Sequence, residues 1–295
     1  MNYYNEIKNK LVDNEIYSKV KDYSKEKHRV ITYYETGKLL SEAGSAYGEN
    51  IIEKYASQLV VEVGKKYNYR TLYRMRKFYQ VFNDEKLTTL LSKLTWSHYL
   101  LVLSIENIYE IEYYIKVTIE QNLSVRDLES KIKSKEYERL DEKTKNKLIN
   151  KEEEKIEDFI KNPILIKNSY KEEISEKLLK RLIMEDIDNF LKELGNGFCY
   201  IENEYKIKLG DRYNYIDLLL FNYIYNAFVV VELKITELKK EHIGQIKMYM
   251  NYIDKNVKSI NQDNTIGIII CKKDNMFVME YCSDRRVYRT IYECI

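Results

Sequence analysis

Three charged side chains interrupt two apolar segments in the second half of the chain. Asp217 lies within the segment YIDLLLF, and Glu232 and Lys234 lie within VVVELKI. Residues two apart in a strand point to the same side, so Glu232 and Lys234 share a face. The short interval at residues 223–226 can turn the chain back and place Asp217 beside Glu232. We therefore expect two carboxylates and one ammonium group to meet at the edge of a sheet.

This combination indicates metal-dependent hydrolysis of a phosphodiester. Carboxylates in apolar strands are costly to bury unless their charge is compensated. Mg²⁺ supplies that compensation through one or two carboxylates, waters and phosphate oxygens. A bound ion lowers the pKa of a water, and a lysine can orient that water and stabilise the developing charge. The alternative is purely structural: Glu232 and Lys234 would be strand-end charges, and Asp217 a polar residue near a turn.

The elements that must position these residues change in type along the chain. Helical spacing dominates the first 140 residues, for example at 51–63 and from about Tyr69, and a capping pattern at TWSH (95–98) starts a further helix. After residue 171 we expect helices over 173–194 and 237–256, and strands over 198–209, 215–221, 227–233 and 265–271. The continuous apolar runs FVVVEL and IGIIIC are typical of strands that are covered on both faces. The sequence thus predicts an α+β protein of two domains.

A charged stretch separates the two halves. Residues 131–155 are mostly charged, and Pro163 is the only proline of the chain. We therefore expect a helical domain over 1–150, a charged linker over 151–170 and an α/β domain over 171–295.

Composition excludes several classes of protein. The 295 residues include 49 Lys and Arg and 47 Asp and Glu, a net charge of +2, so bulk charge predicts no nucleic-acid or membrane partner. Four cysteines without a CxxC pair and three histidines make a Cys/His zinc site an unfavoured reading. The N-terminus lacks the apolar core of a signal peptide, and no apolar run is long enough to span a membrane. A cytoplasmic location is expected.

One segment of the helical half is basic and free of acids. KKYNYRTLYRMRK (65–77) contains Lys65, Lys66, Arg70, Arg74, Arg76 and Lys77. A helix, a turn containing Gly64 and a second, basic helix is the layout of a helix-turn-helix. Its cations would contact DNA phosphates. The alternative is a solvated cationic face that pairs with acids elsewhere.

The chain resembles the YhcG-type family of PD-(D/E)XK nuclease-domain proteins over most of its length. The segments that carry the resemblance are YYETGKLL (33–40), YRTLYRMRKFYQVF (69–82), LTWSHY (94–99), SVRDLESKI (124–132), FLKELGNGF (190–198), YIDLLLF (215–221), VVVELKI (229–235), GQIKMYMNY (244–252) and TIGIIIC (265–271). The resemblance implies an all-α, DNA-binding N-terminal domain and a C-terminal domain with a restriction-endonuclease-like fold around a central mixed sheet. It also implies a metal-dependent DNA endonuclease that uses Mg²⁺, or Mn²⁺ in its place.

The family motif carries over to particular residues of this chain. Asp217 matches the first acid, after Ile216 in place of proline, while Glu232 matches the second acid and Lys234 the lysine. Gln245 matches a glutamine that often borders such sites.

The resemblance leaves the acid of the first helix open. Lys180 stands at one position where relatives tend to have an acid, which leaves Glu176 or Glu185, and we include Glu185 among the catalytic residues. With the backbone carbonyl of Leu233, Asp217 and Glu232 form the expected metal-ligand set.

The sequence also allows a second function, a second substrate and a dimeric state. An inactive nuclease fold that serves in DNA binding or assembly is the alternative, supported by the unassigned helix glutamate. RNA is a less favoured substrate for the same site. A homodimer is a further expectation, since nucleases that cut both strands often pair their active sites.

Overall fold

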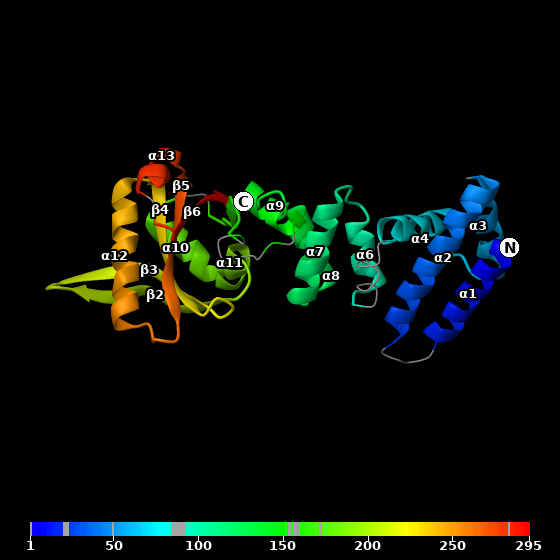
Figure 1. Cartoon of the computed structure of the whole chain (residues 1–295), viewed down its shortest axis with the longest axis horizontal. Helices are drawn as coiled ribbons and strands as arrows, with labels where there is room; N and C mark the ends of the chain where they lie inside the picture. The colour runs from blue at the N-terminus through cyan, green and yellow to red at the C-terminus, as the bar shows by residue number, and fades with distance from the viewer. Residues whose placement is uncertain are drawn as a thin grey trace. The chain divides into compact units, whose positions relative to one another are not determined.

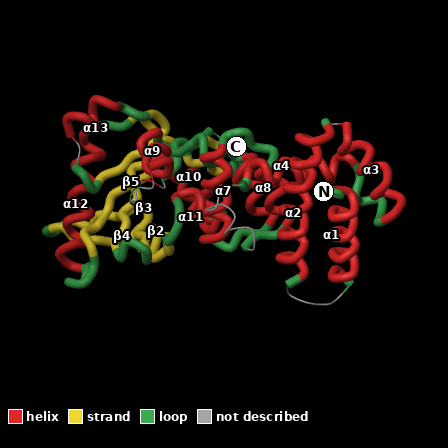
Figure 2. Tube along the Cα trace, turned by 45° about the vertical axis from the view of Figure 1, so that its right-hand side comes forward, coloured by secondary structure: helices red, strands yellow, loops and turns green. Residues whose placement is uncertain are grey.

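The chain divides into two compact units, residues 1–137 and residues 138–295. A computed structural model describes residues 2–19, 24–48, 50–83, 93–150, 152, 155, 158, 160–170, 173–282 and 284–295. Figure 1 shows the order of the elements along the chain, and Figure 2 distinguishes helices from strands. Every described strand belongs to the second unit. The predicted succession of a helical region and a mixed-sheet domain is confirmed.

The first unit is built from helices, several of which are capped at the N-terminus by a local side chain. The helices are α1 (Tyr3–Ser18), α2 (Lys25–Tyr47), α3 (Asn50–Glu62), α4 (Tyr69–Val81), α6 (Trp96–Val102), α7 (Ile108–Glu120) and α8 (Val125–Lys133). The predicted cap before α6 is confirmed, since the Nδ1 atom of His98 lies 2.8 Å from the hydroxyl oxygen of Thr95. His98 is also packed, with Nε2 3.1 Å from the carbonyl oxygen of Leu123.

An aromatic core and one close helix crossing hold this unit together. Trp96 packs edge-on against Tyr33 of α2 and Phe78 of α4, with ring centroids 4.9 Å and 5.3 Å away. At the crossing of α2 with α4, Gly37 faces the backbone of Met75. A Cβ atom at Gly37 would lie 2.0 Å from the carbonyl oxygen of Met75. The two helices can therefore approach this closely only because residue 37 has no side chain.

The second unit contains a six-stranded mixed sheet. Its elements are α9 (Glu142–Asn150), β1 (Ile164–Ile166), α10 (Glu176–Glu185), α11 (Ile187–Leu194), β2 (Phe198–Leu209), β3 (Arg212–Asn222), β4 (Ala227–Glu237), α12 (Lys240–Asn256), β5 (Asp263–Lys273), α13 (Met276–Cys282) and β6 (Val287–Cys294). The strand order is β1-β6-β5-β4-β3-β2. β3 pairs antiparallel with both β2 and β4, and β5, β6 and β1 continue from β4 in parallel.

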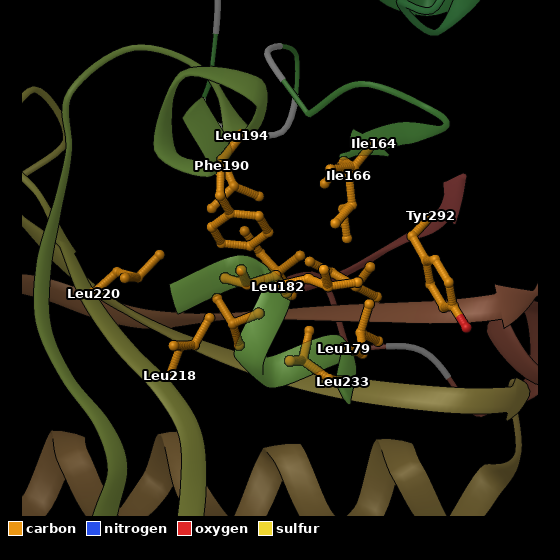
Figure 3. Close-up of a cluster of buried hydrophobic side chains, with 14 of the residues drawn as sticks. Ile164, Ile166, Leu179, Leu182, Phe190, Leu194, Leu218, Leu220, Leu233 and Tyr292 are labelled. Carbon is orange, nitrogen blue, oxygen red and sulfur yellow. The ribbon is translucent and has the colours of Figure 1, made fainter. Parts of the chain in front are cut away.

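Both faces of the sheet are covered, as the apolar runs predicted. On one face, α10 and α11 pack on the strands, and Figure 3 shows Leu179, Leu182 and Phe190 converging on Leu218 and Leu233. On the other face, α12 and part of α13 form a second cluster with the strands. Figure 2 shows the strands between these two groups of helices.

No described helix is both long enough and apolar enough to cross a membrane.

Two expectations about the second unit are wrong in detail. The single helix expected over 173–194 is divided at Asp186, which leaves the helical conformation (φ −132°, ψ 47°) and precedes α11. α10 packs on β4, whereas α11 packs on β1 and β2, so the break lets each half follow its own part of the sheet. Residues 164–166, within the expected linker, form β1 and pair with β6. A strand of three residues is too short to be recognised from its pattern, because its partner lies more than 120 residues away.

Replacing Gly37 by alanine should destabilise the first unit. The added methyl group would collide with the backbone of α4, and overpacking of this kind costs about 1–3 kcal/mol or more. Trp96 is the only tryptophan and is buried beside both helices, so its fluorescence during urea unfolding reports on this unit. Gly244→Ala is the matched control, because a Cβ atom there meets nothing within 4 Å and alanine favours the helix. Equal unfolding midpoints for Gly37→Ala and the unmodified chain would contradict the close crossing.

Candidate active site

Asp217 and Glu232 meet where β3 and β4 stop pairing. The paired register runs from Asn222 opposite Ala227 to Leu218 opposite Val231, so each carboxylate lies one residue beyond the last pair. At this point the backbone N–H of Leu233 donates a hydrogen bond to Oδ2 of Asp217 at 2.8 Å. The side chain of Asp217 thus accepts a backbone donor of β4 at the end of the ladder. The structure brings the two predicted carboxylates onto neighbouring strands.

Lys234 reaches the second carboxylate from its own strand. Its Nζ atom lies 3.0 Å from Oε2 of Glu232, as expected for residues on one strand face. Burial alone would lower the pKa of Lys234, but the nearby charge of Glu232 and the hydrogen bond to it outweigh that effect and raise it. Lys234 is therefore held in its charged form beside Glu232.

Of the charged groups at the site, the Glu232 carboxylate is the most deeply buried. Its side chain is 1% exposed, and Oε1 has no hydrogen-bond partner among the described residues. Burial, followed by repulsion from Asp217, raises the pKa of Glu232 to about 7 although Lys234 opposes the rise. An unpartnered carboxylate oxygen in a buried site is costly unless a proton or a cation reaches it.

Lys180 of α10 supplies a second cation. Its Nζ atom lies 2.6 Å from Oδ1 of Asp217 and 3.6 Å from Oε1 of Glu204 on β2. Burial acts to lower the pKa of Lys180, but the hydrogen bond and ion pair with Asp217 prevail and raise it. Both oxygens of Asp217 are therefore engaged, one by a backbone N–H and one by this ammonium group. Lys180 thus contacts the site from a position at which the resemblance implies an acid.

The donor set fits a hard divalent cation. Oxygen ligands from one or two carboxylates suit Mg²⁺, which keeps several of its waters. Among the residues that the structure describes, no group of three or more His, Cys, Asp and Glu side chains could hold a metal ion. The fit rests on the unpartnered Oε1 of Glu232 beside Asp217. Oδ1 of Asp217 could bind a cation only if Nζ of Lys180 moved away from that oxygen.

Gln245 lies on α12, but its amide is turned to a neighbour on the same helix. Its Nε2 atom donates a hydrogen bond to the hydroxyl oxygen of Tyr249 at 2.9 Å. Burial raises the pKa of Tyr249, and the charges of Glu232 and Asp217 add to the rise, so this part of α12 lies within electrostatic reach of the site. No hydrogen bond joins Gln245 to either carboxylate in the described part of the chain. The sequence reasoning missed Tyr249, although its spacing of four from Gln245 places both on one helix face.

The structure does not bring Glu185 to the carboxylate pair. Its Oε1 atom accepts hydrogen bonds from Tyr170 and Arg181, both at 2.8 Å. Glu185 follows Lys180 by five residues, which turns it by roughly 140° around the helix from the side chain that contacts Asp217. Glu176 precedes Lys180 by four residues and so shares its face, and its charge contributes to the raised pKa of Lys234. Of the two candidate helix acids, Glu176 is the one near the site.

The basic segment of the first unit divides into engaged and exposed cations. Lys66 pairs with Glu15 at 2.5 Å, and Nζ of Lys77 donates to the carbonyl oxygen of Leu103 at 2.6 Å. The remaining cations of the segment are Lys65, Arg70 and Arg74, which are exposed, and Arg76, which is half-buried. Arg70 and Arg74 alternate on α4 with two exposed tyrosines, Tyr69 and Tyr73.

Ionisation of Glu232 should lower the free energy of unfolding as the pH rises, and Glu232→Gln should lack this loss because glutamine does not ionise. The folded-state pKa of about 7 lies above the ordinary value of 4.5, so the folded protein holds the proton more tightly than the unfolded chain. Stability should be full below pH 4.5, fall towards pH 7 and stay low above it. In EDTA, the stability of Glu232→Gln relative to the unmodified chain should be greater at pH 8 than at pH 5, by about 2–3 kcal/mol.

Urea unfolding followed by circular dichroism at both pH values measures this difference. Glu185→Gln is the control, because hydrogen bonds from Tyr170 and Arg181 lower the pKa of Glu185 and move its titration below this range. A stability difference between Glu232→Gln and the unmodified chain that is the same at pH 5 and pH 8 would contradict the raised pKa.

Family models match both units of the chain. Residues 157–291 match the YhcG PDDEXK nuclease domain, and residues 12–139 match the DUF1016 N-terminal domain. Over 283 residues the chain is 25% identical to the Escherichia coli (strain K12) protein named "Putative nuclease YhcG", covering 81% of this chain and 76% of that protein.

Two solved structures show a weaker likeness. One is a repair endonuclease from Pyrococcus abyssi, with a TM-score of 0.29 and 19% identity over 41% of this chain. The other is the EndoMS–dsDNA2 complex, with a TM-score of 0.29 and 17% identity over 43% of this chain. The matches span 48% of each of those chains, about half their length, and TM-scores this low carry no argument.

The assignment rests instead on the two family matches and on the residues at the end of β3 and β4. The second unit is a PD-(D/E)XK nuclease domain with a mixed sheet. The chain belongs to the YhcG-type family of PD-(D/E)XK nuclease-domain proteins.

Proposed function

We propose that this protein is a divalent-cation-dependent DNA endonuclease whose active site is formed by Asp217, Glu232 and Lys234. The observation that carries the proposal is the buried Glu232 carboxylate, which lies beside Asp217 with one oxygen unpartnered among the described residues. A chain without a catalytic task has no evident reason to keep two carboxylates at the end of apolar strands. Membership of a nuclease family agrees with this chemistry.

Each residue has a separate role in the proposed hydrolysis. Asp217 and Glu232 would hold Mg²⁺, or Mn²⁺ in its place, together with the carbonyl oxygen of Leu233. The chemistry that such a cation supplies is a lower pKa for a bound water and a polarised phosphoryl group. Lys234 would orient the attacking water and stabilise charge on the phosphate, and Gln245 would assist by hydrogen bonding to water or DNA. The products would be two DNA ends, one of which carries the phosphate.

The first unit would engage DNA through α4. Arg70 and Arg74 are exposed on one side of the helix, and the structure gives neither of them an ion pair with a described carboxylate. Cations in this arrangement contact phosphates and give affinity that falls with salt. Lys66 and Lys77 contribute less to the proposal, because their ammonium groups already have partners within the unit.

An inactive nuclease fold that binds DNA is the second candidate function. The ion pair between Lys180 and Asp217 favours it, because the ammonium group competes with a cation for Oδ1. With Lys180 and Lys234 both charged, the two carboxylates are already balanced by two ammonium groups. The two functions differ in whether Lys180 can leave Asp217 when a divalent cation arrives.

Substitutions at the proposed site should abolish cleavage. Asp217→Ala, Glu232→Gln and Lys234→Ala should each lower the cleavage rate by at least about 100-fold, because each removes a group that acts on the cation, the water or the phosphate. The assay follows linear, supercoiled and branched DNA with Mg²⁺, Mn²⁺ or EDTA. Glu185→Gln should cleave at the unmodified rate. Cleavage that survives both Asp217→Ala and Lys234→Ala would rule out this site.

Lys180→Gln separates the two candidate functions in the same assay. If Lys180 only competes with the cation, this variant should reach half-maximal cleavage at a lower Mg²⁺ concentration than the unmodified chain. Absence of metal-dependent cleavage in both chains, with DNA binding retained, would favour the inactive fold.

Removing the exposed arginines of α4 should weaken DNA binding in a salt-dependent manner. In Arg70→Gln/Arg74→Gln, the slope of log affinity against log salt concentration for a 20-base-pair duplex should fall in magnitude by about 1.8, the value for two lost phosphate contacts. Fluorescence anisotropy in EDTA measures it. Lys38→Gln/Lys54→Gln removes two exposed lysines of α2 and α3 as a control of equal charge. Equal slopes for the arginine pair and the lysine pair would contradict a specific role of α4.

A further inference from the structure

The distal part of the β2–β3 hairpin leaves the sheet. β3 pairs with β4 only from Leu218 to Asn222, whereas its pairing with β2 continues to Arg212 opposite Leu209. Residues 204–217 therefore form a two-stranded ribbon without a neighbouring strand on the β4 side. Figure 1 shows this hairpin running past α12 and projecting from the second unit.

One face of the ribbon is packed and holds it in position. Ile207 and Ile216 are 1% and 0% exposed and belong to the apolar cluster that α12 forms with the sheet. Leu209, next to the turn, packs partly against the same cluster. The ribbon is thus braced by α12, so its other face has a defined orientation.

The opposite face carries two cations and two aromatic rings. Lys206 lies opposite Tyr215, and Lys208 lies opposite Tyr213, so that the four side chains form two adjacent cross-strand pairs. Tyr213 and Tyr215 are 55% and 51% exposed, and Nζ of Lys206 lies 4.0 Å from the ring centroid of Tyr213. Neither lysine lies within ion-pair distance of a carboxylate in the described part of the chain. We call these four residues the ribbon face.

The ribbon face leads directly to the candidate active site. The next residues on the two strands at the same spacing are Glu204 and Asp217, and Lys180 contacts both of them, at 3.6 Å and 2.6 Å. From Tyr213 to Asp217 the strand rises about 13 Å, at about 3.3 Å per residue.

We infer that the ribbon face binds an unpaired strand of DNA beside the scissile phosphate. Lys206 and Lys208 contact phosphates, while Tyr213 and Tyr215 stack on bases. Cations interleaved with exposed aromatic rings are the usual means of holding single-stranded nucleic acid. Rings can stack in this way only on bases that are free of a duplex partner, which selects an unpaired strand over a continuous duplex. The position of the scissile phosphate rests on the proposed function, but the binding of DNA to the ribbon does not.

The test measures binding of the full chain to a fluorescent 12-nucleotide single strand in EDTA. Tyr213→Ala/Tyr215→Ala should weaken this binding at least about five-fold, the low end for loss of one stacked base, and leave binding to a blunt duplex of the same sequence unchanged. Lys206→Gln/Lys208→Gln should reduce the salt slope for the single strand by about 1.4. Tyr213→Phe/Tyr215→Phe keeps the rings and should bind as the unmodified chain does, which separates stacking from folding.

The control removes the same charge elsewhere in the second unit. Lys192→Gln/Lys255→Gln changes exposed lysines of α11 and α12 and should leave the single-strand slope nearly unchanged. Unaltered single-strand binding by the Tyr→Ala pair, or equal losses for single strand and duplex, would overturn the inference. Failure of the two proposals is distinguishable, because binding is read in EDTA. Mg²⁺-dependent cleavage with unaltered single-strand binding by the ribbon variants would overturn only the ribbon, and ribbon-dependent binding without cleavage would overturn only the nuclease activity.

Discussion

The burial of the Glu232 carboxylate is the constraint around which the second unit is arranged. This side chain lies in an apolar strand beside a second carboxylate, an arrangement that would be strongly unfavourable without nearby positive charge. Lys234 provides one ammonium group from the same strand, and Lys180 provides another across the site from α10. β3, β4 and α10 must therefore be held together accurately, which is the task of the apolar clusters on both faces of the sheet.

The point at which β3 stops pairing with β4 places Asp217 outside that ladder, and the ribbon begins at the same point. Because β3 stops pairing with β4 at Leu218, the Asp217 carboxylate takes a hydrogen bond from Leu233, while the strand continues outward with β2 alone. On β2, Glu204 has a positive φ of 53°, a local irregularity opposite this point. One interruption of the ladder thus creates both a polar site and a projecting surface. In this chain, the position of an expected acid on α10 is taken by Lys180, which adds a cation that the site must accommodate.

The elements that depend on local sequence patterns were predicted correctly. β3, β4 and β5 follow from apolar runs, α12 follows from helical periodicity, and the cap at Thr95 and His98 follows from side-chain chemistry. The adjacency of Asp217 and Glu232 also followed from spacing, since a short turn leaves few ways to pair two apolar strands. The break at Asp186 and the short strand β1 were not predictable, because each depends on contacts with distant parts of the sheet. Glu185 was misplaced for the same reason: the face that α10 turns towards the site depends on its packing.

The sequence by itself determined the types and order of the elements, the family and the identity of the charged residues in the apolar strands. These are properties of residue type and spacing, which survive without knowledge of distant contacts. Only the tertiary structure decided that Lys180 pairs with Asp217, that Oε1 of Glu232 has no partner among the described residues, and that the β2–β3 hairpin leaves the sheet. Each of these depends on groups from separate elements that approach within a few ångströms. Burial and ion pairing act over that distance, and no local pattern in the chain encodes which groups from separate elements approach each other.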